Sequence, residues 1–174
     1  MQSNVQGTFE LLKVARQLHE TDEASFKKFV YVSTDEVYGP VPPSNGVYSA
    51  IDWDQLIKEG FSEYHAFNPR NPYSASKAAA EHIVMGYHHT YGLPTVITRG
   101  CNTDGPWQTP EKLLPLMILK ALRGDDLPVY GDGQQQREWM HAEDHAAGIL
   151  FAAKIGVPGE VYNLGTQESH TNLR

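Results

Sequence analysis

Two short stretches of the sequence carry side chains that could do chemistry together. In the first, Ser33 and Thr34 are followed directly by Asp35 and Glu36, so two hydroxyls adjoin two carboxylates. Neighbouring carboxyl groups can act as one acid and one base when their surroundings separate their pKa values. The alternative is that these residues only cap a turn at a strand end, where Ser, Thr and Asp are common.

The second stretch begins at Tyr73 and ends at Lys77, four residues later. On a helix this spacing puts both side chains on one face, about one turn apart. A nearby cation lowers the pKa of a phenol from its usual value of about 10, so Tyr73 could accept a proton from a hydroxyl. Alone, the two residues could equally be a surface pair on an amphipathic helix. A strand that ends in Ser-Thr-Asp-Glu some forty residues upstream makes the combination specific.

The apolar pattern places both stretches in an alternation of helices and strands. The run 29–32 is β-branched and aromatic, which predicts an inner strand of a parallel sheet, buried on both faces. Helices are predicted over 4–19, 52–59, 73–91, 111–124 and 142–154, and further strands over 95–98, 128–130, 137–140 and 161–164. Gly131-Asp-Gly133 predicts a hairpin or a turn. The alternation up to Gly124 predicts a doubly wound α/β sheet with ligands at the carboxyl ends of its strands.

Composition and charge narrow the class of protein. The chain has 174 residues and a formal net charge of −7, which argues against a nucleic acid or an anionic membrane as partner. No apolar run approaches the ~20 residues of a membrane span, and the first residues do not resemble a signal peptide. The single cysteine, Cys101, excludes an intramolecular disulfide and suits a reducing compartment. We therefore expect a cytoplasmic protein.

The histidines form two pairs that could suggest metal ligands. His141 and His145 are four residues apart, and His88 and His89 are adjacent. A zinc site needs three or four ligands of suitable geometry with a second shell. His88 and His89 lie late in a predicted helix, where imidazoles suit the helix dipole, and most histidines are core or surface groups without a metal. Cys101 has no recognisable histidine partner that would make it a nucleophile. We therefore expect no metal and no cysteine chemistry.

Several motifs match one family. They include Val-Ser-Thr-Asp-Glu-Val-Tyr-Gly at 32–39, Asn-Pro-Tyr-Ser-Ala-Ser-Lys at 71–77 and Pro-Glu-Lys-Leu-Leu-Pro at 110–115, with shorter matches at 4–8, 129–131, 136–139, 143–145 and 162–165. These motifs resemble the extended short-chain dehydrogenase/reductases, and within them the 4,6-dehydratases that act on dTDP-glucose. The resemblance covers nearly the whole chain except 41–67. It implies the central and C-terminal part of a Rossmann-like NAD-binding domain over 1–124. Over 125–174 it implies part of a nucleotide-sugar-binding lobe, with a strand returning to the sheet.

The resemblance also implies a reaction, in which dTDP-glucose becomes dTDP-4-keto-6-deoxyglucose and water. Tyr73 would take the proton of the sugar 4-hydroxyl as hydride leaves C4 for NAD. Glu36 would then remove the C5 proton, Asp35 would protonate the departing 6-hydroxyl, and hydride would return to C6. Thr34 would hydrogen-bond the sugar hydroxyl. Lys77 would bind the nicotinamide ribose and hold Tyr73 deprotonated.

Further binding residues follow from the same resemblance. The cofactor contacts it implies are Ser33, Tyr73, Lys77 and Thr103. The substrate contacts it implies are Thr34, Asn102, Lys112, Leu113, Pro128, Val129, Tyr130, Arg137 and Asn172. The guanidinium of Arg137 suits a diphosphate, although a plain surface arginine is the alternative. Asp104 departs from the family, which usually has a tyrosine there, and it puts a carboxylate near the expected cofactor and diphosphate.

Family members begin with a strand and a Gly-rich turn that holds the cofactor pyrophosphate, and no Gly-x-x-Gly-x-x-Gly occurs here. They also continue further than this chain. We therefore expect a middle portion of a longer protein that is inactive alone and forms a homodimer at full length. One alternative is an epimerase or decarboxylase on another nucleotide sugar, although these lack the Thr-Asp-Glu triplet. The other alternative is a catalytically silent interaction module.

Overall fold

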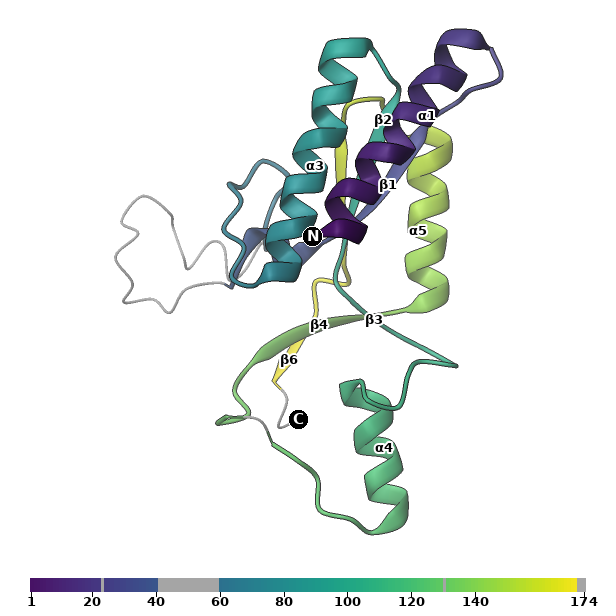
Figure 1. Ribbon diagram of the computed structural model, residues 1–174. Coiled ribbons are helices and arrows are strands. Elements are labelled where there is room, and N and C mark those ends of the chain that lie inside the picture. The colour runs from purple at the N-terminus through teal and green to yellow at the C-terminus, as the bar shows by residue number, and fades with distance from the viewer. Residues whose placement is uncertain (23, 41–59, 130, 172–174) are drawn as a thin grey trace. The chain divides into compact units, whose positions relative to one another are not determined.

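The computed structural model describes residues 1–22, 24–40, 60–129 and 131–171 (Figure 1). The predicted helix 52–59 therefore lies outside the described residues. The chain divides into two compact units: unit 1 comprises Met1–Gly100 and Gly148–Leu164, and unit 2 comprises Cys101–Ala147 and Gly165–Arg174. The elements in chain order are η1 (Gln2–Gln6), α1 (Gly7–Thr21), β1 (Phe29–Thr34), η2 (Asp35–Tyr38), α3 (Pro72–Tyr91), β2 (Thr95–Gly100), β3 (Asn102–Asp104), α4 (Leu113–Arg123), β4 (Gln136–His141), α5 (Ala142–Ile155), β5 (Val161–Leu164) and β6 (Ser169–Thr171).

Unit 1 contains a parallel sheet with the strand order β1-β2-β5. All six residues of the central strand β2 are buried. The register pairs Thr34 with Gly100, and Gly100 with Leu164, so the three strands end at the same edge. This parallel α/β arrangement confirms the predicted fold class, and it puts the polar stretch after β1 at the edge where ligands bind in such sheets.

The prediction that β1 is an inner strand buried on both faces is wrong for the described residues. Tyr31 packs into the core, but Val32 on the opposite face is 39% exposed. The reason is that β1 pairs only with β2 and lies at an edge of the described sheet. The fully buried strand is β2.

Helix α3 begins and ends where its sequence predicts, because both ends carry strong signals. Asn71 is the N-cap and forms a capping box with Ser74, and Pro72 occupies the first turn. Gly92 ends the helix with a φ of 68°, a conformation that favours glycine. Figure 1 shows α3 running beside α1. The buried core between these helices and the sheet consists of Leu12, Ala15, Tyr31, Ala80, Val84, Leu93 and Ile97.

Unit 2 is built from shorter elements. Its sheet has the order β3-β4-β6, with β3 parallel and β6 antiparallel to β4. The turn predicted at 131–133 is present, but the described residues form no hairpin there, because Pro128 and Val129 form no strand. Both edges of β4 are occupied by β3 and β6 instead. The pairing of β3 with β4 also draws residues 101–124 into unit 2, whereas the sequence predicts a boundary near 124.

No helix in the described part of the chain is long and apolar enough to cross a membrane.

Candidate active site

The carboxyl end of β1 turns directly into the short helix η2. The Thr34 hydroxyl oxygen accepts a hydrogen bond from the Glu36 backbone N–H at 3.3 Å, so Thr34 caps η2, and the hydroxyl also donates to Asp35 Oδ1 at 3.3 Å. Val37 and Tyr38 are buried and anchor the turn, whereas Asp35 and Glu36 are half-buried. The capping role that the sequence left as an alternative is therefore real, and it leaves both carboxylates accessible.

Tyr73 and Lys77 lie on the first turns of α3. Tyr73 is 49% exposed, so its phenol is open to a ligand. The Lys77 ammonium donates to the backbone carbonyl of Val32 at 2.8 Å and lies 5.0 Å from the centre of the Tyr31 ring. Lys77 thereby ties the start of α3 to the end of β1, which brings the two chemical stretches of the sequence together.

Asn71 makes a second link between the same two segments. Its side-chain amide donates to Glu36 Oε2 at 2.8 Å, while its carbonyl oxygen caps α3. The sequence analysis gave Asn71 no role of its own. The available signal was an Asn directly before Pro-Tyr, which is a preferred N-cap residue with a spare donor.

The charge environment of Tyr73 differs from the expectation. Its pKa is raised, first by burial and then by the negative charges of Glu36 and Asp35. The expected lowering by Lys77 is therefore wrong for this arrangement, because carboxylates and partial burial dominate. Burial lowers the pKa of Lys77, and the carboxylate of Glu81 one turn along opposes that effect.

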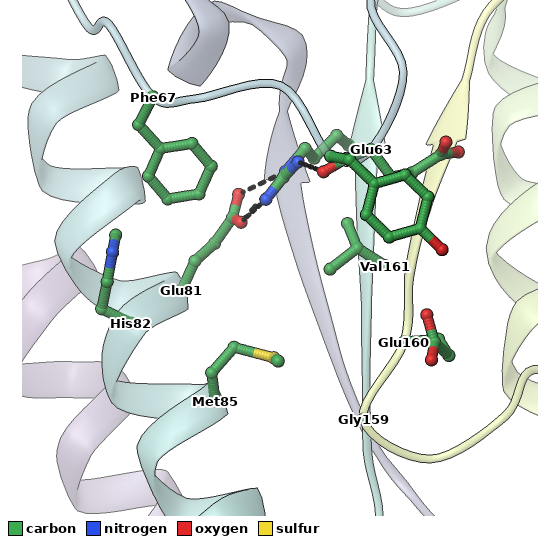
Figure 2. A pocket seen from close by; sticks show the side chains of 10 residues that line it. Glu63, Phe67, Glu81, His82, Met85, Gly159, Glu160 and Val161 are labelled. Atoms are coloured by element: carbon green, nitrogen blue, oxygen red, sulfur yellow. Dashed lines mark hydrogen bonds and ion pairs between the residues drawn. The ribbon is translucent and has the colours of Figure 1, made fainter.

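Unit 1 also holds a pocket of about 270 Å³ (Figure 2), and the sequence analysis missed it. Glu81 reaches from α3 into this pocket and pairs with Arg99 of β2 at 2.7 Å. Both side chains are almost fully buried, and Arg99 also donates to the hydroxyl of Tyr38 at 2.6 Å. The Arg99 guanidinium stacks over the rings of Tyr38 and Phe67. This buried network fixes α3, β2 and η2 to one another.

The predicted residues of unit 2 are described separately. Thr103 lies on β3, where its hydroxyl oxygen is 2.7 Å from Nδ1 of His145, whose pKa is lowered by burial. Asp104, the departure from the family, pairs in register with His141 of β4. The predicted substrate residues occupy β3 (Asn102), the start of α4 (Lys112, Leu113), the segment before the turn (Pro128, Val129) and β4 (Arg137). Lys112, Val129 and Arg137 are exposed, while Tyr130 and Asn172 lie outside the described residues.

No group of three or more His, Cys, Asp or Glu side chains in the described segments could hold a metal ion. Cys101 is buried.

Comparison with known proteins identifies the family. The NAD dependent epimerase/dehydratase family matches residues 1–165. The chain belongs to this family. The dTDP-glucose 4,6-dehydratase of Escherichia coli is 43% identical over an aligned stretch of 177 positions, which covers 99% of this chain and 47% of the relative. The chain therefore spans about half the length of the curated relatives it matches.

Solved structures agree with this assignment. The dTDP-glucose 4,6-dehydratase of Bacillus anthracis in complex with NAD has a TM-score of 0.83 and 41% identity, over 98% of this chain and 48% of that one. The dTDP-glucose 4,6-dehydratase of Streptomyces venezuelae with NAD and TYD bound has a TM-score of 0.80 and 40% identity, over 98% of this chain and 46% of that one. These likenesses confirm the Rossmann-like fold and the predicted family resemblance.

Proposed function

We propose that this chain carries the catalytic centre of an NAD-dependent dTDP-glucose 4,6-dehydratase. The observation that carries the proposal is the hydrogen-bonded joining of the two stretches, Lys77 to Val32 and Asn71 to Glu36. These two hydrogen bonds tie the helix of Tyr73 and Lys77 to the segment of Thr34, Asp35 and Glu36. This supports a base for oxidation next to an acid and a base for elimination. The relatives that the chain matches are dTDP-glucose 4,6-dehydratases, which supports the same proposal.

The residues of unit 1 fit an NAD nicotinamide and its ribose. The Ser33 hydroxyl is buried at the end of β1 and has no hydrogen-bond partner among the described residues. Lys77 uses one donor on Val32, and an ammonium has three. Ser33, Tyr73 and Lys77 would therefore hold the cofactor, which supplies an acceptor for the C4 hydride and returns that hydride to C6. Thr103 remains a predicted cofactor contact, and its hydroxyl already bonds His145.

The side chains divide the reaction between them. Tyr73, as phenolate, takes the proton of the sugar 4-hydroxyl. The resulting 4-ketone acidifies the C5 hydrogen, which Glu36 removes, and Asp35 protonates the 6-oxygen so that water leaves. When C6 is reduced, the protonated Glu36 would return this proton to C5, which gives the saturated 4-keto-6-deoxy sugar. A phenol with a raised pKa is a stronger base once ionised, although fewer molecules carry that form at neutral pH. Thr34 can donate to a sugar hydroxyl only by giving up its hydrogen bond to Asp35.

The substrate contacts of unit 2 remain proposals. The exposed Lys112 and Arg137 suit the negative charge of a nucleoside diphosphate. Pro128, Val129 and Arg137 belong to the nucleotide-sugar-binding lobe that the sequence predicts over 125–174. Asn102, Lys112 and Leu113 precede that range and would contact the same substrate.

A hybrid protein tests the proposed function. Residues 1–174 replace the matching segment of the Escherichia coli relative, and the hybrid is incubated with dTDP-glucose and NAD. We expect the 4-keto product, measured by its absorbance in base. A hybrid that binds NAD but forms only an epimerised sugar, or no product at all, would contradict the proposal.

We also propose a homodimer and a cytoplasmic location. On the outer face of α1, Leu11 and Val14 are exposed, and so is Tyr91 at the end of α3; such apolar faces favour a self-complementary contact. Met85 of α3, by contrast, is partly buried and packs against the core. Light scattering should report a dimer for the hybrid and a monomer after Leu11→Glu with Val14→Glu. A hybrid that is monomeric at micromolar concentration would disprove the dimer. The single cysteine and the nucleotide-sugar substrate support the cytoplasm.

A further inference from the structure

The orientation of the Asn71 amide is fixed by the helix that it caps. The Asn71 carbonyl oxygen accepts from the Ser74 backbone N–H at 2.8 Å, and Ser74 Oγ accepts from the Asn71 backbone N–H at 3.3 Å. Ser74 is fully buried, so this cap has little freedom. Because the oxygen is committed to the cap, the amide nitrogen must face the other way, and there it donates to Glu36 Oε2 at 2.8 Å.

The backbone on the Glu36 side is fixed as well. The Glu36 N–H bonds the Thr34 hydroxyl, and the Val37 carbonyl accepts from the Asn68 N–H at 2.9 Å. Gly39 ends η2 with a φ of 76°, and a side chain there would collide with the carbonyl oxygen of Asn68. With η2 held in this way, the freedom left to the Glu36 carboxylate is rotation of its own side chain. The bond from Asn71 restricts that rotation.

We infer that Asn71 is a positioning residue for Glu36, an inference that rests on the proposed function. The amide holds Oε2, and Oε1 has no hydrogen-bond partner among the described residues, so Oε1 is the oxygen that can take the C5 proton. The same cap starts the helix that carries Tyr73 and Lys77. Asn71 therefore ties the base for elimination to the helix that carries the base for oxidation.

Variants that keep the cap separate the two roles of Asn71. Serine and aspartate also accept from the N-terminal N–H groups of a helix, but neither donates an amide hydrogen to Glu36. In single turnovers of the hybrid, bound NADH rises on C4 oxidation and decays after elimination. We expect Asn71→Ser to leave the rise unchanged and to slow the decay about tenfold to a hundredfold, the scale of a misplaced catalytic group. Asn71→Asp, which puts a second carboxylate beside Glu36, should slow the decay as well.

A double variant tests whether Asn71 acts through Glu36. Asn71→Ser should slow the decay no further in a Glu36→Gln background, because residues that work as one unit are not additive. In the 174-residue chain itself, the side-chain amide protons of Asn71 should shift in NMR spectra on Glu36→Gln. Thermal unfolding of Asn71→Ser checks that the helix cap is intact.

Each outcome decides one point. If Glu36→Gln stalls the decay but Asn71→Ser and Asn71→Asp do not, the positioning role is wrong and the proposed function stands. If Asn71→Ser lowers the rate of NADH formation and the rate of NADH decay by the same factor, Asn71 acts only as a helix cap. This outcome also overturns the inference. If Glu36→Gln decays at the unmodified rate, Glu36 is not the base and the elimination step of the proposed function fails.

Discussion

The two compact units hold their proposed functional residues in different ways. In unit 1, the chain around Thr34, Glu36 and Tyr73 is anchored by a fully buried strand and by the apolar core. In unit 2, α4 has no buried residue, and Leu122 is 80% exposed. The reacting groups thus lie on backbone that packing fixes, whereas three of the proposed nucleotide-sugar contacts, Lys112, Val129 and Arg137, lie at exposed positions. Groups that make and break bonds must be in position before the substrate arrives. A charged side chain that only binds the ligand can be ordered by the ligand itself.

The buried ion pair of unit 1 gives the largest expected effect. Glu81→Gln leaves the Arg99 guanidinium buried without its counter-charge, and such losses cost about 3–5 kcal/mol. The matched control is Glu20→Gln, which breaks the exposed pair with Arg16 and should leave the unfolding midpoint nearly unchanged. Urea unfolding of the 174-residue chain measures both. If both substitutions lower the free energy of unfolding by the same amount, the buried ion pair is no more important for stability than the exposed one, which would contradict this prediction.

Apolar side chains extend the comparison across the units. Leu12 is fully buried in the core of unit 1, so Leu12→Ala should destabilise by about 2–5 kcal/mol. Leu122 of α4 is mostly exposed, and Leu122→Ala should stay within about 0.5 kcal/mol. Hydrogen exchange should likewise find the amides of β2 more protected than those of α4. A loss from Leu122→Ala as large as that from Leu12→Ala would contradict the contrast between the units.

The titration of Tyr73 tests whether burial and neighbouring carboxylates in unit 1 determine the pKa of this phenol. Because burial, Glu36 and Asp35 raise its pKa, Tyr73 should stay protonated at a pH where an ordinary tyrosine is half ionised, near 10. Glu36→Gln removes one of these negative charges and should move the midpoint down. The chain has nine tyrosines, so the ultraviolet titration curve of Tyr73→Phe is subtracted from that of the unmodified chain. The difference is the titration curve of Tyr73. A midpoint below 10 in the unmodified chain would instead indicate control by Lys77.

The sequence was most informative where a local signal decides the structure. The apolar run of β2 and the Pro72 and Gly92 signals at the ends of α3 were enough to place both elements. The Ser-Thr-Asp-Glu and Tyr-x-x-x-Lys stretches were enough to nominate the site. The errors concern pairing at a distance. Nothing local to β1 says which strands flank it, and nothing near Gly131 says that β4 pairs with β3 and β6.

The site interactions that were missed have the same origin. Arg99 and Glu81 are 18 residues apart, and Asn71 and Glu36 are 35 apart, so only the fold brings them together. The sign of the pKa shift of Tyr73 also depends on burial and on carboxylates of another segment. A spacing rule such as Tyr-x-x-x-Lys names the partner on the same helix and cannot weigh it against those groups.

The most direct test of the account compares two single variants of the hybrid protein, Tyr73→Phe and Glu36→Gln. The absorbance of NADH is recorded during a single turnover of each variant. Tyr73→Phe should give neither NADH nor product, because no 4-ketone forms. Glu36→Gln should form NADH and hold it, with dehydration slowed roughly 10²–10⁴-fold, the usual contribution of a general base. Asp35→Asn should be milder, since water can partly replace an acid. Dehydration by Glu36→Gln at the unmodified rate, or C4 oxidation by Tyr73→Phe, would contradict the division of roles between η2 and α3.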